Sequence, residues 1–177
     1  MDRRIVSVGI AGGIAGAVVM AMYAMIAAAT YQHTGFFTPL YHIASPIIGT
    51  DTLMRSMGTT YFSLGPALVG LVVHMMVGAF WGIVFALGAS RLGLRGPAAA
   101  GVGIVYGLAV MLFMAFIGLP ITAAVLRGGD MVSDMATLVG WGTFAVEHAT
   151  YGLVLGAVWA ARGVTVDHVG STARVHA

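Results

Sequence analysis

The stretch PALVGLVVHMMVGAFWGIVFALGA, residues 66–89, decides the fold, because it is an apolar run whose one ionisable residue is His74. A helix needs about 20 predominantly apolar residues to cross the hydrocarbon core of a bilayer. Runs of similar length occur at 5–29, 98–119 and 138–161. The sequence therefore predicts an all-α membrane protein, with four transmembrane helices forming a single domain over residues 1–177.

The composition supports this class. Of the 177 residues, 59% are hydrophobic and only 8% are charged, and the mean hydropathy is +0.97. Soluble domains carry about 25% charged residues, so the main partner of this surface is expected to be the lipid bilayer. A net charge of +2 is too small to indicate a nucleic-acid partner. The absence of cysteine excludes disulfides and thiolate chemistry.

The arginines predict the orientation, because cytoplasmic loops carry an excess of positive residues. The loops 30–65 and 120–137 hold only Arg55 and Arg127. The other arginines precede the first span, follow the fourth or lie between the second and third: Arg3, Arg4, Arg91, Arg95, Arg162 and Arg174. This pattern predicts cytoplasmic N and C termini (N-in/C-in), a cytoplasmic tail at 162–177, and outer loops at 30–65 and 120–137.

The loop 30–65 is the only sizeable segment outside the predicted spans. Asp51 and Arg55 have the spacing of an ion pair on one helical face, which predicts a short interfacial helix over Thr50–Met57. His33 and His42 also lie in this loop. We expect both to be ordinary interfacial or exposed histidines.

The spans contain an internal repeat. HMMVGAFWG (74–82) and HATYGLVLG (148–156) share the pattern H-x3-G-x3-G, and GGIAGAVVM (12–20) and GIVYGLAVM (103–111) share G-x3-G-x3-M. The chain is therefore predicted to be two helical hairpins related as parallel repeats. Glycines four residues apart let membrane helices approach closely. The predicted packing positions are Gly12, Gly16, Gly78, Gly82, Gly103, Gly107, Gly152 and Gly156.

One turn further along the same four stripes lie Met20, His74, Met111 and His148. All four lie near mid-membrane, so they are candidates for a binding site on the bundle axis. Glu147 is a further unusual residue of the spans, because it has no counterpart in the first hairpin, where Val73 stands at the matching position. A charged, unpaired carboxylate is costly in a bilayer. We expect Glu147 to be protonated, or paired with His74 or with Tyr151.

Several interpretations of these residues stay open. The histidines can hydrogen-bond neighbouring helices and hold the bundle in register. Histidine and methionine can ligate Cu(I), and two facing imidazoles can bind the iron of haem b axially. Glu147 and a histidine can also exchange protons while a substrate moves. The metal and the cofactor are therefore unknown from the sequence.

The segments VHMMVGAFWGIVFALGA (73–89), GIVYGLAVMLFMAFIGLP (103–120) and EHATYGLVLGAVW (147–159) resemble small four-span bacterial proteins of the YagU-like type. The resemblance implies a multi-pass bacterial inner-membrane protein and brings no established activity with it. We predict a non-enzymatic accessory or binding component. The alternatives are a proton- or copper-linked transporter and a b-type haem protein. The glycine stripes also allow a homodimer or a larger membrane complex.

Overall fold

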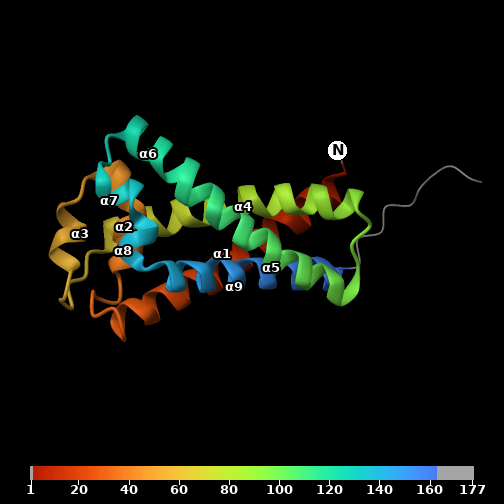
Figure 1. The fold of residues 1–177 in the computed structure, drawn as a ribbon, viewed down its shortest axis with the longest axis horizontal. Coiled ribbons are helices and arrows are strands. Elements are labelled where there is room, and N and C mark those ends of the chain that lie inside the picture. The colour runs from red at the N-terminus through yellow and green to blue at the C-terminus, as the bar shows by residue number, and fades with distance from the viewer. Residues whose placement is uncertain (1, 163–177) are drawn as a thin grey trace, which may run out of the picture.

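The computed structural model describes residues 2–162, and within them every regular element is helical (Figure 1). Four helices are long and apolar enough to cross a membrane, which confirms the prediction of an all-helical fold with four such segments. They are α1 (Arg3–Ala29), α4 (Leu64–Arg91), the segment Gly96–Leu126 and α9 (Trp141–Arg162). The predicted tail, apart from Arg162, lies outside the described residues.

The third long helix continues past Leu119, where the hydropathy pattern predicts its end. It consists of α5 (Gly96–Phe113), a π-helical turn η1 (Met114–Gly118) and α6 (Leu119–Leu126). In the wide turn the Leu119 amide donates to the Met114 carbonyl. Proline lacks an amide hydrogen and ordinarily disrupts a helix, but Pro120 follows this π turn, which absorbs the irregularity. The helix therefore runs on to Leu126.

The fourth long helix begins at Trp141 and not at residue 138, as predicted. Gly140 has φ +90°, a conformation that glycine adopts without steric cost. It separates α9 from the short helix α8 (Met135–Val139). The apolar residues before Gly140 therefore belong to a different element.

Four short helices cover one end of the bundle, which we call the capped end (Figure 1). They are α2 (Thr38–Ile48), α3 (Asp51–Ser56), α7 (Asp130–Ser133) and α8. The predicted helix over Thr50–Met57 corresponds to α3, whereas α2 was not predicted. The opposite end holds the start of α1, the turn between α4 and α5, and the end of α9. It contains Arg3, Arg4, Arg91, Arg95 and Arg162, and we call it the arginine end.

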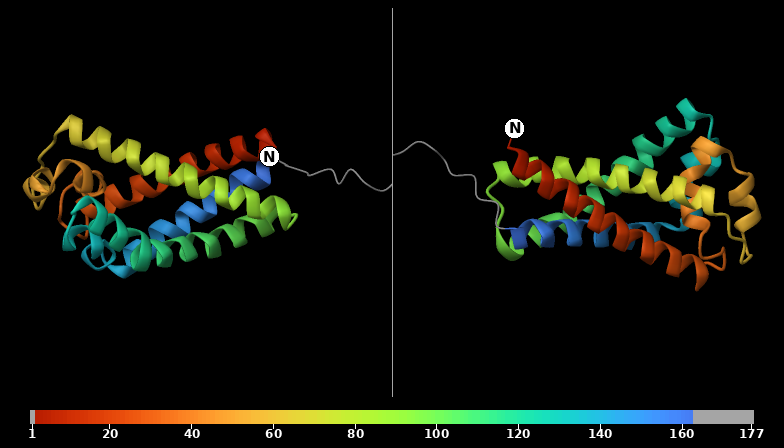
Figure 2. Two further views of the ribbon diagram at one scale, coloured as in Figure 1. Left: turned by 90° about the horizontal axis from the view of Figure 1, so that it is seen from above. Right: turned by 180° about the vertical axis from the view of Figure 1, so that it is seen from behind.

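The order in space differs from the order in sequence. Helix α1 packs against both α4 and α9, and α5 packs chiefly against α9, whereas α4 and α5 make little main-chain contact. In the right-hand view of Figure 2, α1 crosses in front of α4 and α9, the two helices that it contacts. Aromatic side chains bridge α4 and α5 instead: the Tyr106 hydroxyl donates to the Trp81 carbonyl at 2.7 Å. The space between α4 and α5 is therefore filled by side chains, and the two helices do not pack directly against each other there.

Glycines set the closest approaches in the half of the bundle near the arginine end. Added Cβ atoms would meet neighbouring main chain at the predicted positions Gly78, Gly82, Gly103, Gly107, Gly152 and Gly156. In α1, however, the glycines against α4 are Gly9 and Gly13, while Gly12 and Gly16 face Leu155 and Tyr151 of α9. Gly13 contacts Gly78 of α4 as Gly103 contacts Gly152 of α9, so Gly13, and not Gly12, is the counterpart of Gly103. The alignment of the two G-x3-G-x3-M motifs is therefore wrong by one residue.

Candidate functional site

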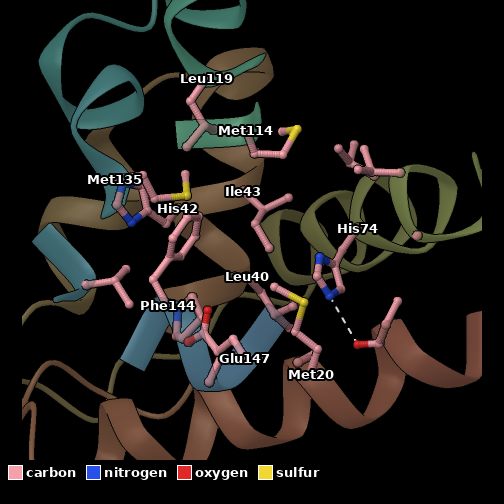
Figure 3. A pocket seen from close by; sticks show the side chains of 18 of the residues that line it. Met20, Leu40, His42, Ile43, His74, Met114, Leu119, Met135, Phe144 and Glu147 are labelled. Atoms are coloured by element: carbon pink, nitrogen blue, oxygen red, sulfur yellow. Dashed lines mark hydrogen bonds between the residues drawn. The ribbon is translucent and has the colours of Figure 1, made fainter. Parts of the chain in front are cut away.

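A cavity of about 260 Å³ lies between the helices on the capped-end side of the glycine contacts (Figure 3). Side chains from α1, α2, α4 and α9 line it, together with residues of α5 to α8. Most of these side chains are apolar. The residues that bring a polar side-chain group are Gln32, His42, His74, Trp81, Thr122, Glu147, His148 and Tyr151. An apolar pocket with a few convergent polar groups is the usual form of a small-molecule site.

The structure brings together most of the predicted site residues. Met20, His74, Glu147 and His148 all line the cavity. Met111 does not: it is buried in a neighbouring apolar cluster with Leu119 and Phe144. The predicted set of Met20, Met111, His74 and His148 therefore does not converge as a whole, although Met114 and Met135 line the cavity beside Met20. The alignment of the α1 and α5 motifs, which matched Met111 with Met20, is wrong by one residue, and this explains why Met111 does not line the cavity.

Each of the three histidines in the cavity wall donates to a main-chain carbonyl. His74 Nε2 donates to Ala17 O at 3.1 Å, and His148 Nδ1 donates to Phe144 O at 2.8 Å. His42 Nε2 donates to Met131 O. Because a carbonyl oxygen only accepts, the bonded nitrogen must carry the proton, and this fixes the tautomer of a neutral ring. The other nitrogen of each neutral ring is then an acceptor.

Glu147 is buried, with 5% of its surface exposed. The pairing expected with His74 or Tyr151 is not found, because His74 donates to Ala17 O and the Tyr151 hydroxyl donates to Gly78 O at 2.8 Å. The carboxyl group makes no hydrogen bond to any described residue. No fully buried side-chain oxygen of the described residues lacks a partner, so the carboxyl oxygens must reach the open space of the cavity. Figure 3 shows Glu147 among the lining side chains.

His42 is the main site residue that sequence reasoning missed. It is buried, with 7% of its surface exposed, contrary to the expectation of an interfacial or exposed side chain. Burial lowers the pKa of its imidazole below the usual 6.5, although the hydrogen bond to Met131 acts in the opposite direction. The apolar stripe of this segment, Leu40, Ile43 and Ile47, could not have revealed it, because His42 lies on a different side of the helix. His33 is exposed, as expected.

The rim of the cavity is apolar. Three lining side chains are well exposed, and each comes from a different helix: Ile47 of α2 (58%), Val77 of α4 (39%) and Leu126 of α6 (47%). In Figure 1, α6 diverges from α4 toward the capped end. Apolar residues at an opening favour contact with lipid over contact with water. The surface beside the cavity is therefore apolar.

Tyrosine contacts and glycine packing close the cavity toward the arginine end. The Tyr151 hydroxyl ties α9 to Gly78 of α4, and Gly78 in turn contacts Gly13 of α1. Gly78 and Tyr151 both line the cavity, so these contacts bound it on the side of the glycine-packed half of the bundle.

Comparison with protein families, with curated proteins and with solved structures finds no match to this chain.

Proposed function

We propose that this chain is a small binding protein of the bacterial inner membrane that holds an apolar or amphiphilic small molecule without transforming it. The cavity carries this proposal, because it combines an apolar wall, polar groups at its centre and an apolar rim. Its volume of about 260 Å³ is slightly below the range of roughly 300–1,000 Å³ typical of ligand pockets. The ligand is therefore about as large as one or two rings.

The orientation in the membrane follows from the charges in this proposal. The arginine end faces the cytoplasm, because positive residues are retained there, so the N and C termini are cytoplasmic and the capped end faces outward. The cavity then opens to the outer half of the bilayer. The YagU-like pattern of the sequence supports the bacterial inner membrane. The similar glycine contacts of α1 with α4 and of α5 with α9 support an origin from a duplicated hairpin.

A proton-linked transporter is the second candidate, and the unpaired carboxyl group of Glu147 favours it. Transport requires the site to open to both sides of the membrane in turn. Here, the contacts of Gly13 with Gly78 and of Gly103 with Gly152 would have to separate to open the arginine end. The binding function needs no such rearrangement, so it is the simpler conclusion.

Copper and haem fit the residues less well. Met111 lies outside the cavity, whereas Met114 and Met135 line it with Met20. Without counting methionine, the described residues contain no group of three or more histidine, cysteine, aspartate or glutamate side chains placed to hold a metal ion. Bis-histidine ligation of a haem would involve His74, whose Nε2 already donates to Ala17 O. We therefore derive no step through either group. An absorption spectrum and metal analysis of the purified protein would reveal a haem Soret band or stoichiometric copper.

The proposal is tested with 4-bromobenzyl alcohol, a neutral one-ring probe, and the protein in lipid nanodiscs. Bromine quenches indole fluorescence, and Trp81 lines the cavity. Subtracting the signal of a Trp81→Phe variant isolates quenching at this site. We expect saturable quenching that Val110→Phe abolishes, because Val110 lines the cavity and is only 5% exposed.

Two further variants control this test. Val105 lies on the same helix, is 68% exposed and does not line the cavity, so Val105→Phe should bind the probe normally. Thr122→Phe fills the cavity from α6 and serves if Val110→Phe fails to fold. Non-saturable quenching, equal in all folded variants, would show that the probe only partitions into lipid and would refute the proposal.

A further inference from the structure

The polar groups of the cavity wall present an excess of acceptors. Besides the three histidines, the Tyr151 hydroxyl donates to Gly78 O at 2.8 Å, Thr122 Oγ1 donates to Gly118 O at 2.8 Å, and Gln32 Nε2 donates to Val139 O at 2.6 Å. Main-chain carbonyls thus use most of the donors in the wall. Among the described residues, the acceptors without a partner are the second nitrogens of the imidazoles, the carboxyl group of Glu147 and the amide oxygen of Gln32, and the donor without one is the Trp81 indole.

No arginine or lysine among the described residues neutralises Glu147. The chain contains no lysine, and no arginine lines the cavity. A single carboxylate in apolar surroundings is costly unless it is paired or protonated. Glu147 must therefore hold either a proton or a cation that comes with the ligand.

From this donor and charge balance we propose that the ligand is a small amphiphilic ammonium ion, whose N–H groups bind the Glu147 carboxylate and the free nitrogen of His148. This inference rests on the proposed binding function and names its ligand class. Phe144 and Trp81 also line the cavity, and aromatic faces attract organic cations. A hydroxyl ligand could satisfy the acceptors, but Glu147 would then have to hold a proton, and its charge would contribute nothing to ligand binding.

The depth of Glu147 suits an amphiphile. It lies six residues after the start of α9 at Trp141, or about 9 Å along the helix axis. The exposed rim residues Ile47, Val77 and Leu126 offer apolar surface to a ligand group directed toward lipid. The ammonium group therefore lies inside the cavity, and the apolar part of the ligand lies toward the rim.

The cation and a proton compete for the carboxylate of Glu147, so the binding of one excludes the other. When the ammonium ion binds to a protonated site, the carboxyl proton is released to water and the net charge of the site is unchanged. Lowering the pH protonates the carboxylate, so it must weaken ammonium binding. The other titratable groups around the cavity and beside Glu147 are His42 on α2, His74 on α4, His148 and Tyr151 on α9, and Tyr23 on α1. Protonation of any of the histidines also repels the cation, in the same direction.

The test compares three bromobenzyl probes in the Trp81 quenching assay: the primary ammonium, the neutral alcohol and the trimethylammonium, which has no N–H. We expect the primary ammonium to bind tightest at about pH 8. In Glu147→Gln, its affinity should fall about thirtyfold or more, while the affinity of the alcohol changes little. Glu147→Asp keeps the charge and should retain part of the preference. Asp51→Asn removes an exposed carboxylate on α3 and should have no effect.

The outcomes separate the two proposals. Saturable binding of the alcohol and the ammonium with equal affinity, or an ammonium preference that survives in Glu147→Gln, overturns the ligand class and leaves the binding function intact. Tight binding of the trimethylammonium overturns the role assigned to N–H donation. Failure of all three probes to bind overturns the binding function itself. Weaker ammonium binding at about pH 5.5 than at pH 8 supports proton competition, and a flat profile contradicts it.

Discussion

Gly101 and Gly103 lie two residues apart on α5, but only Gly103 is closely packed against a neighbouring helix. An added Cβ at Gly103 would collide with the carbonyl oxygen of Gly152, whereas one at Gly101 would have nothing within 4 Å. We therefore expect Gly103→Ala to lower the free energy of unfolding by about 1–3 kcal/mol, as overpacking does. Gly101→Ala should leave it unchanged or raise it slightly, because alanine favours the helix.

Thermal unfolding of the two variants in the same detergent checks this prediction. Equal stability of Gly103→Ala and Gly101→Ala would mean that α5 and α9 do not approach as closely as the structure shows. The comparison is informative because both glycines lie inside the same helix, so the difference between them reports packing.

Individual residues show how much of the candidate site could be predicted from the sequence. His74, His148 and Glu147 were recognisable because polar residues are rare in apolar spans, and they do line one cavity. The place of Met111 could not be predicted, since helix rotation depends on which glycines meet. A shift of one residue turns a helical position by about 100°, which is enough to move Met111 from the cavity into a neighbouring cluster.

At the scale of elements, hydropathy predicts the long helices but not their irregular ends. The π turn before Pro120 and the positive φ of Gly140 are local conformations that an average over apolar residues does not detect. Helix α2 escaped prediction because it contains Pro39 and Pro46. Pro39 lies in the first turn, where proline is tolerated.

The attachment of α2 over the cavity should depend on pH. His42 donates to Met131, near the start of α7, and burial lowers the pKa of its imidazole below 6.5. A detached His42 titrates near 6.5 and therefore binds protons more readily than the docked one. Docking is consequently strongest above this pH and weakens as the pH falls through 6.5 toward the lower pKa of the docked state.

Hydrogen exchange measures this effect, expressed as protection factors so that the intrinsic rate of exchange at each pH is removed. We expect the protection of α2 to fall between about pH 7.5 and about pH 5.5. His42→Gln keeps a donor for the Met131 carbonyl and cannot titrate, so its protection should stay level. A parallel decline in both proteins would assign the pH dependence to another group.

At the scale of the whole molecule, the arrangement of the helices was not accessible from the sequence. Consecutive helices were expected to form two hairpins, and α1 with α4 and α5 with α9 do pack closely. The contact of α1 with α9, and the side-chain-filled gap between α4 and α5, depend on which faces carry glycine. This asymmetric arrangement creates the cavity.

The proposed orientation predicts the accessibility of introduced cysteines, and the natural chain has none to interfere. Met54 on α3 is 58% exposed at the capped end, and Leu92 in the turn at the arginine end is 73% exposed. In intact cells, a membrane-impermeant maleimide should label the Met54→Cys variant. It should label the Leu92→Cys variant only after permeabilisation. The reverse result would invert the topology.

The central claim is that the cavity beside Glu147 holds a ligand, and the anomalous scattering of bromine tests it most directly. Crystals grown with 4-bromobenzylammonium should show one bromine peak inside the cavity, near Trp81 and toward the rim residues Ile47, Val77 and Leu126, with the ammonium density against the Glu147 carboxyl group. Bromine peaks confined to the lipid-facing surface, with the cavity unchanged, would contradict the account.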